Sequence, residues 1–433
     1  MTGDGLDHPL RYELVNELHA RPSPRLTAPL TVVFMAFKEL RNAASRDRSA
    51  DITHLATLAH RHGAPAPQPG AQHYAAQLGR YELAWESHTE FVTYAAFLPG
   101  LAPRPFDARV AEIFPAEWQQ DAPGARLAAL IVHVEHVPED PAEIDTKLEA
   151  WFARDGLAAA QVMDGLAVVA SDFRIDANGF MRFAIFVQPG SGAGRTGRVI
   201  QRLIDLEIYR SMSMLGLGRG RALSALLNRL DPRISTLMGG LAGETADPEA
   251  VLHDLLGVSA ELEVAATDSS FRFGATRAYA AIVAERLASL RESRFFSRQT
   301  LSEFMDRRFA PAMRTVASTE ARLNTMLDRT ERASELLRTR VDVERSGASR
   351  DLLARMDRRA DLQLRLQNTV EGLSVVAISY YAVGLLSYFL TPLAHRIAVD
   401  KAVLTAGLVP VVVLAVWYAM RRIRRSLHDG APE

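Results

Sequence analysis

Three ionisable residues at alternating positions give this chain its clearest candidate for metal chemistry. In the segment Glu86-Ser87-His88-Thr89-Glu90, an extended backbone would place Glu86, His88 and Glu90 on one side, since successive strand side chains point to opposite faces. Carboxylate oxygens and imidazole nitrogens are ligands for divalent metal ions. The spacing therefore predicts a divalent metal ion at these residues. The alternative is an exposed polar turn whose histidine is solvated or hydrogen-bonded.

Two further motifs invite a chemical interpretation. His133-Val134-Glu135-His136 could supply more metal ligands, although nothing in the sequence brings this segment to the first one. Residues 192–197 spell GxGxxG between a predicted strand and a predicted helix, the spacing of a dinucleotide-binding loop. The preceding strand belongs to a predicted antiparallel hairpin rather than to a βαβ unit. We therefore interpret residues 190–197 as an interdomain linker and predict no cofactor-binding residue in it.

The usual parts of a hydrolase are missing from the sequence. It contains no GxSxG motif, no HExxH motif and no cysteine. Hence we predict no catalytic residue and favour a protein that is not an enzyme. The formal net charge of −1 gives no reason to expect nucleic acid as a partner.

The candidate metal residues need a scaffold, and the first half of the chain predicts one built on strands. Apolar runs occur near residues 30–37, 78–85, 90–98, 127–134, 166–175 and 180–187. Asn178-Gly179 is a strong hairpin signal between the last two runs. With helices predicted near 51–61 and 142–153, the fold class is α+β with a mixed or antiparallel N-terminal sheet.

After the glycine-rich segment the strand pattern gives way to helices. Arg198–Leu215 has an amphipathic period, and further helices are predicted around 221–230, 248–265 and 275–291. A helix over 313–344 is predicted to end at Ser346-Gly347 and to fold back along a second, continuous helix that runs from about residue 349 to Pro392. These helices form the predicted stalk domain.

The C-terminal sixty residues contain two uncharged segments, Gly372–Ala394 and Ala402–Met420. A helix needs about 20 apolar residues to cross the hydrocarbon core of a bilayer, so both segments predict transmembrane helices. The predicted organisation is a sheet domain at 1–189, a linker at 190–197, a helical stalk at 198–371, transmembrane helices at 372–394 and 402–420, an extracytoplasmic link at 395–401 and a basic cytoplasmic tail at 421–433.

The arginines around the two segments predict their orientation. Basic residues cluster before the first segment and after the second, whereas the link holds only Arg396 and Lys401. Because cytoplasmic loops carry the excess of Lys and Arg, we expect both termini in the cytoplasm of a bacterial cell and the hairpin in its inner membrane. No signal peptide is visible at the N-terminus.

Small and hydroxyl-bearing residues follow one face of the first transmembrane segment at spacings of three and four. They are Ser374, Ala377, Tyr381, Gly384, Tyr388 and Thr391. Such residues let membrane helices pack closely and hydrogen-bond to one another, which predicts a helix-helix interface in a homo-oligomer. The alternative is a polar stripe that lines a pore. No ionisable residue lies within the segment, which disfavours a proton relay.

Several segments together resemble a bacterial family of membrane-anchored proteins that is defined as a domain of unknown function. The segments are His19–Pro22, Trp85–Glu86, His88–Phe91, Ile208–Arg210 and Glu371–Tyr381. The resemblance spans nearly the whole chain, and its last segment is the most specific. It implies a membrane location and this architecture, but no activity and no catalytic residue.

The plan of the chain is also similar to that of CorA-type divalent cation channels, which have an α/β cytoplasmic domain, a long stalk helix and two C-terminal membrane helices. Those channels carry Gly-Met-Asn at the end of the first membrane helix. This chain has Thr391-Pro392-Leu393-Ala394 there. The departure removes the element that selects ions in that family.

We therefore expect a membrane protein with a cytoplasmic head and stalk that acts as an oligomeric binding or scaffolding device, in contact with the lipid bilayer and with an unidentified protein partner or ligand. A CorA-like ion channel or transporter with altered selectivity is the first alternative. A metal-dependent enzyme that uses Glu86, His88 and Glu90 is the second.

Overall fold

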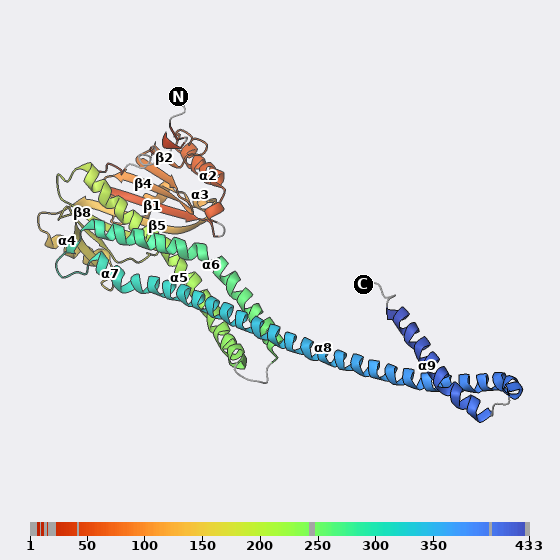
Figure 1. Ribbon diagram of the computed structural model, residues 1–433. Coiled ribbons are helices and arrows are strands. Elements are labelled where there is room, and N and C mark those ends of the chain that lie inside the picture. Colours follow the sequence, from red (N-terminus) through yellow and green to blue (C-terminus); the bar gives the residue numbers. More distant parts are fainter. Residues whose placement is uncertain are drawn as a thin grey trace. The chain divides into compact units, whose positions relative to one another are not determined.

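The computed structural model describes residues 7–8, 10–12, 15, 23–40, 43–241, 247–397 and 401–428 (Figure 1). The chain divides into two units, Met1–Ser334 and Glu335–Glu433. His19–Pro22, one of the segments that carry the family resemblance, lies outside the described residues.

The first unit is built on one mixed sheet, as the sequence predicts. Within the described residues nine strands pair in the order β2-β3-β4-β1-β5-β8-β7-β6-β9. All neighbours are antiparallel except β5 and β8, which are parallel. The strands are β1 (Leu30–Lys38), β2 (His73–Leu78), β3 (Tyr81–Ser87), β4 (Phe91–Pro99), β5 (Ala125–His136), β6 (Ala158–Val162), β7 (Ala167–Ser171), β8 (Met181–Val187) and β9 (Ser293–Arg294).

Both predicted hairpins are confirmed. Strands β3 and β4 pair across the turn that follows Ser87, and β7 and β8 pair across the segment that contains Asn178-Gly179. Gly179 has a φ of +83°, a left-handed conformation that glycine adopts without strain. Asp176 Oδ1 accepts from the backbone N–H groups of Asn178, at 2.9 Å, and Phe180, at 3.0 Å, which fixes the turn.

Helices cover both faces of the sheet, which explains why β1 is apolar along its whole length. Val32, Phe34 and Ala36 belong to the hydrophobic cluster on one face, and Val33 and Met35 to the cluster on the other. One face is covered by α2 (Arg48–Arg61), η2 (Ala108–Ile113), α3 (Ala116–Gln120) and α4 (Ala142–Trp151), and the short η1 (Ala43–Ser45) precedes α2. The other face is covered by the first part of α5 (Ala193–Leu241), the end of α6 (Pro248–Leu290) and α7 (Leu301–Arg308).

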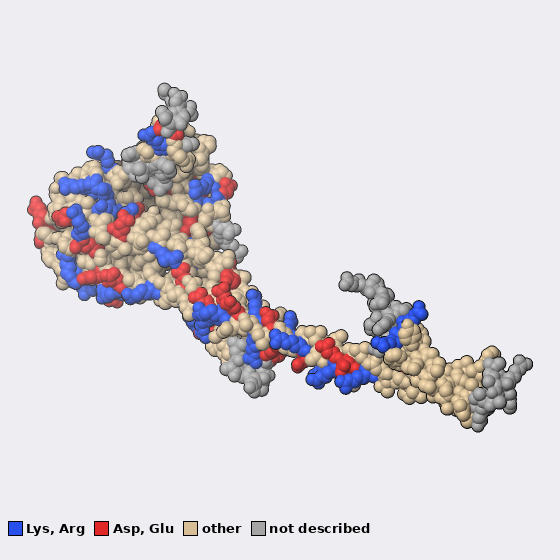
Figure 2. Space-filling view, in the orientation of Figure 1, with Lys and Arg blue, Asp and Glu red and all other residues tan. Residues whose placement is uncertain are grey.

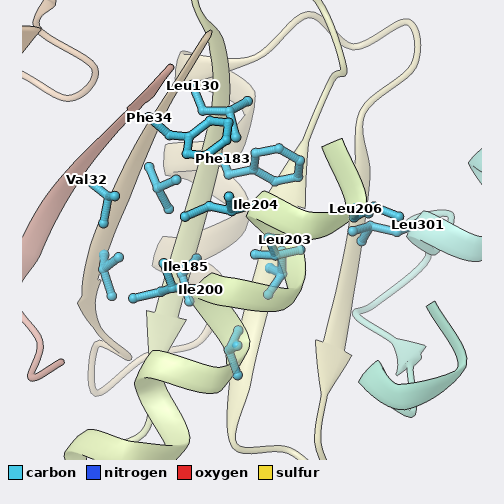
Figure 3. Packing of buried hydrophobic residues seen from close by; sticks show 14 of the residues in the cluster. Val32, Phe34, Leu130, Phe183, Ile185, Ile200, Leu203, Ile204, Leu206 and Leu301 are labelled. Atoms are coloured by element: carbon cyan, nitrogen blue, oxygen red, sulfur yellow. The ribbon is translucent and has the colours of Figure 1, made fainter. Parts of the chain in front are cut away.

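Helix α5 confirms the predicted amphipathic helix and extends it in both directions. Ile200, Leu203 and Ile204 point from α5 into the core beside Phe34 and Phe183 (Figure 3). Farther along, α5 packs with α6 and the start of α8 (Ala310–Ile397) around a second apolar cluster. Helices α5 and α6 thus cover the sheet face on which the candidate site lies.

The glycine-rich segment that we predicted to be a linker is partly helical. Helix α5 begins at Ala193, so residues 193–197 belong to it, while Gly190 and Gly192 keep positive φ angles of +77° in the turn before it. A Cβ atom on Gly197 would lie 1.7 Å from the carbonyl oxygen of Pro24. This glycine allows the segment before β1 to cross α5 at close range, which gives it a packing role.

The break that we predicted at Ser346-Gly347 is wrong, because α8 continues through both residues. The fold-back of a helix over 313–344 is wrong for the same reason. A single glycine inside a helix costs about 1 kcal/mol relative to alanine, and the many other residues of α8 offset that cost.

Within the described part of the chain, two helices are long enough and apolar enough to cross a membrane. One is the end of the helix that reaches Leu390, and the other covers Ala402–Ile423 within α9 (Lys401–His428), which contains Pro410. Figure 2 shows mostly tan, uncharged surface over this part of the chain, with blue basic side chains at the end of α9. Tyr381, Tyr388 and Phe389 are 69%, 77% and 80% exposed. Residues 398–400 of the predicted link lie outside the described residues.

Candidate functional site: a cavity between the sheet and helix α5

A cavity of about 380 Å³ lies between α5 and strands β1, β3 and β4. The side chains on its floor are small, because Ala84 of β3 pairs with Ala95 of β4. Ala95 in turn pairs with Phe34 of β1. Two adjacent alanines leave room that larger residues would fill. Its volume falls within the range of about 300–1,000 Å³ that is typical of small-molecule sites.

Charged side chains of α5 form one wall of the cavity. Arg198, Arg202 and Asp205 are spaced by four and three residues, which places them on one helix face, and all three line the cavity. Arg286 reaches the same space from α6. Both oxygens of Asp205 are bound, since Gln201 Nε2 and Arg286 Nε each donate to one of them at 2.9 Å.

The cations of this wall outnumber its anions. Arg202 Nη1 donates to the carbonyl oxygen of Ser289 at 3.0 Å, a neutral acceptor. Among the described residues, no carboxylate lies within 4 Å of Arg198 or Arg202. Burial lowers the pKa of Arg202, and the nearby guanidinium groups, Arg198 foremost, lower it further. Burial also raises the pKa of Asp205, against the opposing effect of Gln201 and Arg286.

Two of the three predicted metal ligands lie at the opposite wall. His88 Nε2 and Glu86 Oε2 are 3.4 Å apart, and both residues line the cavity. The His88 ring stacks on Phe91 with 4.4 Å between ring centroids. The structure thus brings Glu86 and His88 together as a pair that borders the cavity.

Glu90, the third predicted ligand, has other partners and is only 1% exposed. It forms an ion pair with Arg272 of α6, accepts a hydrogen bond from Tyr279 Oη at 3.0 Å, and lies 3.7 Å from Lys38 Nζ. Within the described part of the chain, no group of three His, Asp or Glu residues is arranged to hold a metal ion. The carboxylate of Glu90 instead fastens α6 to the sheet.

A buried arginine fixes the turn that carries His88. Arg46 Nε donates to Asp51 Oδ2 at 2.8 Å, and its Nη2 donates to Ser87 Oγ at 3.0 Å and to the carbonyl oxygen of His88 at 2.6 Å. The same side chain also bonds the carbonyl oxygen of Thr89. Clamped by Arg46, the turn holds its position beside the cavity.

The segment His133–His136 does not join this site. On β5, Ile131 packs into the cluster that faces α2 and α4, and His133 and Glu135 follow at alternate positions on the same face. His133 Nε2 lies 3.2 Å from Glu135 Oε2, and Glu135 Oε1 pairs with Lys147. The sheet therefore separates His133 from the cavity, which lies on the face of Phe34.

The predicted stripe on the first membrane segment is largely exposed in the single chain. Ala377, Tyr381 and Tyr388 are exposed, while Ser374 and Gly384 are half-buried. The side chain of Thr391 lies outside the described residues. The buried positions of this part of α8 are Ser379 and Ser387, and α9 buries Val412. Most of the stripe is thus available for contact with another helix.

Three segments that carry the family resemblance converge on the cavity. Glu86 and His88 come from the β3–β4 region, and Ile208 and Tyr209 line the cavity from α5. A family model described as a protein of unknown function (DUF3422) matches residues 6–427. The chain belongs to this family. The match covers both units, so the DUF3422 family includes the sheet, the long helices and the apolar C-terminal segments.

Neither a curated protein nor a solved structure matches the chain. The similarity of plan to CorA-type channels is not shown by these comparisons. The family assignment thus supports the architecture and leaves the activity to be argued from the site.

Proposed function

We propose that this protein is a membrane-anchored binding protein that assembles into homo-oligomers. The observation that carries the proposal is the apolar surface of its last two helices, where large side chains such as Tyr381, Leu385 and Phe389 face outward. A continuous exposed apolar surface of this length is unfavourable in water and is satisfied by lipid. The cavity beside α5 supplies the binding site.

The arginines at the outer ends of the two spans support an orientation with both termini in the cytoplasm. Arg355, Arg358, Arg359 and Arg365 precede the first span, and Arg421, Arg422, Arg424 and Arg425 follow the second. Under the positive-inside rule, this asymmetry favours the sheet domain and the C-terminal tail on the same side of the bacterial inner membrane.

Membrane integration is tested by extracting cell membranes at alkaline pH, which releases peripheral proteins. The full chain should remain in the pellet and enter solution only with detergent. Release of most of the protein by alkali alone would contradict the proposal.

The exposed stripe on α8 supports self-association. Apart from the helix's own backbone, no heavy atom of the described residues lies within 4 Å of a Cβ built on Gly384. A larger side chain therefore fits the isolated chain but would separate a second helix packed there. Gly384→Leu should therefore lower the oligomer mass measured by light scattering in detergent. Leu386→Ile, two residues farther along and therefore about 160° around the helix from Gly384, is the control on the opposite face. Equal masses for wild type and Gly384→Leu would contradict the predicted interface.

A further inference from the structure

We propose that the cavity beside α5 binds a small organic oxyanion, with its carboxylate or phosphate group held by Arg198 and Arg202 and its apolar body on the floor formed by Ala84 and Ala95. This inference rests on the binding part of the proposed function and names the chemical class of the ligand. It depends on the contents of the cavity and not on the membrane spans.

The charges that line the cavity are unbalanced in favour of an anion. Arg286 is neutralised by Asp205, at 2.9 Å, and Glu86 lies 3.4 Å from His88. Arg198 and Arg202 remain without a carboxylate partner among the described residues. Two guanidinium groups that border the same space repel each other, and a bound anion removes that repulsion.

The two guanidinium groups are suited to an oxyanion. A guanidinium carries five N–H donors in a planar fork that matches carboxylate and phosphate oxygens. Arg202 uses one nitrogen for the carbonyl of Ser289, which orients its side chain and leaves other donors for a ligand. Arg198 precedes it by one helical turn on the same face of α5. The donors of Arg202 are therefore oriented before a ligand arrives, which lowers the entropic cost of binding.

The rest of the cavity indicates that the ligand has an apolar part. Ile208 of α5 lines the cavity, and Phe34, Ala84 and Ala95 line it from the strands opposite the arginines. An inorganic anion would leave this wall in contact with water. A molecule with an oxyanion at one end and a short aromatic or aliphatic body at the other contacts both walls at once.

The test is isothermal titration calorimetry on the full chain in detergent, with 3-phenylpropionate, phenyl phosphate and the uncharged 3-phenylpropanamide as probes. We expect at least one of the two anions to bind at least tenfold more tightly than the amide. Arg198→Gln should lower the affinity for that anion about tenfold, which is the effect of losing one charge-assisted hydrogen bond. Arg221→Gln, at an exposed position of the same helix away from the cavity, should leave the affinity unchanged.

Equal affinities for the anions and the amide, or an Arg198→Gln variant that binds like wild type, would overturn the proposal. Because Arg198 is exposed and has no structural partner among the described residues, Arg198→Gln separates loss of binding from loss of folding; circular dichroism of the same sample verifies the fold. The test does not depend on membrane insertion, so alkaline release of the protein with intact anion binding would refute the anchoring alone.

The oxyanion can come from a soluble acid or from a lipid. Nanodiscs of zwitterionic lipid and nanodiscs that contain an anionic phospholipid distinguish these sources. Weaker probe binding in the anionic nanodiscs would identify a lipid as the occupant, provided that the weakening persists in Arg221→Gln and in added salt below 50 mM. Equal probe binding in the two kinds of nanodisc would identify a soluble acid. Both results support an oxyanion site.

Discussion

Replacing Glu90 with alanine should destabilise the sheet-bearing unit far more than replacing Glu86 with alanine, although the two residues are only four positions apart in the sequence. The carboxylate of Glu90 is contacted by Arg272, Tyr279 and Lys38. The side chain of Arg272 is 16% exposed and that of Lys38 is 10% exposed. Removing it leaves two cations with little access to water and an unpaired phenol.

Breaking a buried ion pair by removal of one partner costs about 3–5 kcal/mol. Burial and the neighbouring Arg272 already lower the pKa of Lys38, and Glu90 opposes that effect, so its loss further disfavours the charged lysine. By contrast, Glu86 and His88 form a more accessible pair, with side chains 28% and 16% exposed, and a pair of this kind contributes about 0–1 kcal/mol.

The assay is chemical denaturation of the full chain in detergent, followed by tryptophan fluorescence. Three of the four tryptophans, Trp85, Trp118 and Trp151, lie in the first unit and report on it. A loss of less than about 1 kcal/mol for Glu90→Ala, equal to that of Glu86→Ala, would refute the account of Glu90 as a structural fastener. Stabilisation by added Zn²⁺ that disappears in both variants would instead support the metal site predicted from the sequence.

Three further predictions concern the same unit. Arg46→Ala should lower the unfolding free energy by about 3–5 kcal/mol, measured by the same denaturation, because Asp51 loses its buried partner; an unchanged midpoint would contradict the clamp. Gly197→Ala should cost about 1–3 kcal/mol through its clash with Pro24, whereas Gly218→Ala, with open space around its Cβ, should not destabilise. Burial lowers the pKa of His54, so the folded protein keeps it neutral while the unfolded chain takes up a proton below about pH 6.5. Stability should therefore fall as the pH drops through that value, and His54→Gln should flatten this dependence.

The sequence predicts well those elements whose burial or turn conformation depends on a few neighbouring residues. The continuous apolar run of β1 reflects a strand covered on both faces, and Asn178-Gly179 marks a turn that needs a left-handed residue. Strands β2 and β6 were not predicted. In β2 exposed residues alternate with half-buried ones, and β6 consists mainly of alanine. Neither strand has the β-branched or aromatic composition that is typical of strands.

The cavity was not predicted because its walls come from distant parts of the chain. Arg198, Arg202 and Asp205 lie within a helix that the sequence did predict, at spacings of four and three, and this was the available signal. Nothing local indicates that this helix face meets Ala84 and Ala95, because pairing of β3, β4 and β1 decides which side chains share the floor. The same pairing places His133 on the opposite face from His88.

Labelling of single cysteines in intact cells tests the membrane anchoring most directly, because the chain contains no cysteine of its own. Ser349→Cys precedes the first apolar segment, Ala398→Cys lies in the predicted link, and Ser426→Cys lies in the basic tail. We predict that a membrane-impermeant maleimide labels only Ala398→Cys in intact spheroplasts and labels all three variants after permeabilisation. Labelling of Ser349→Cys or Ser426→Cys before permeabilisation, or protection of Ala398→Cys, would contradict a hairpin with both ends in the cytoplasm.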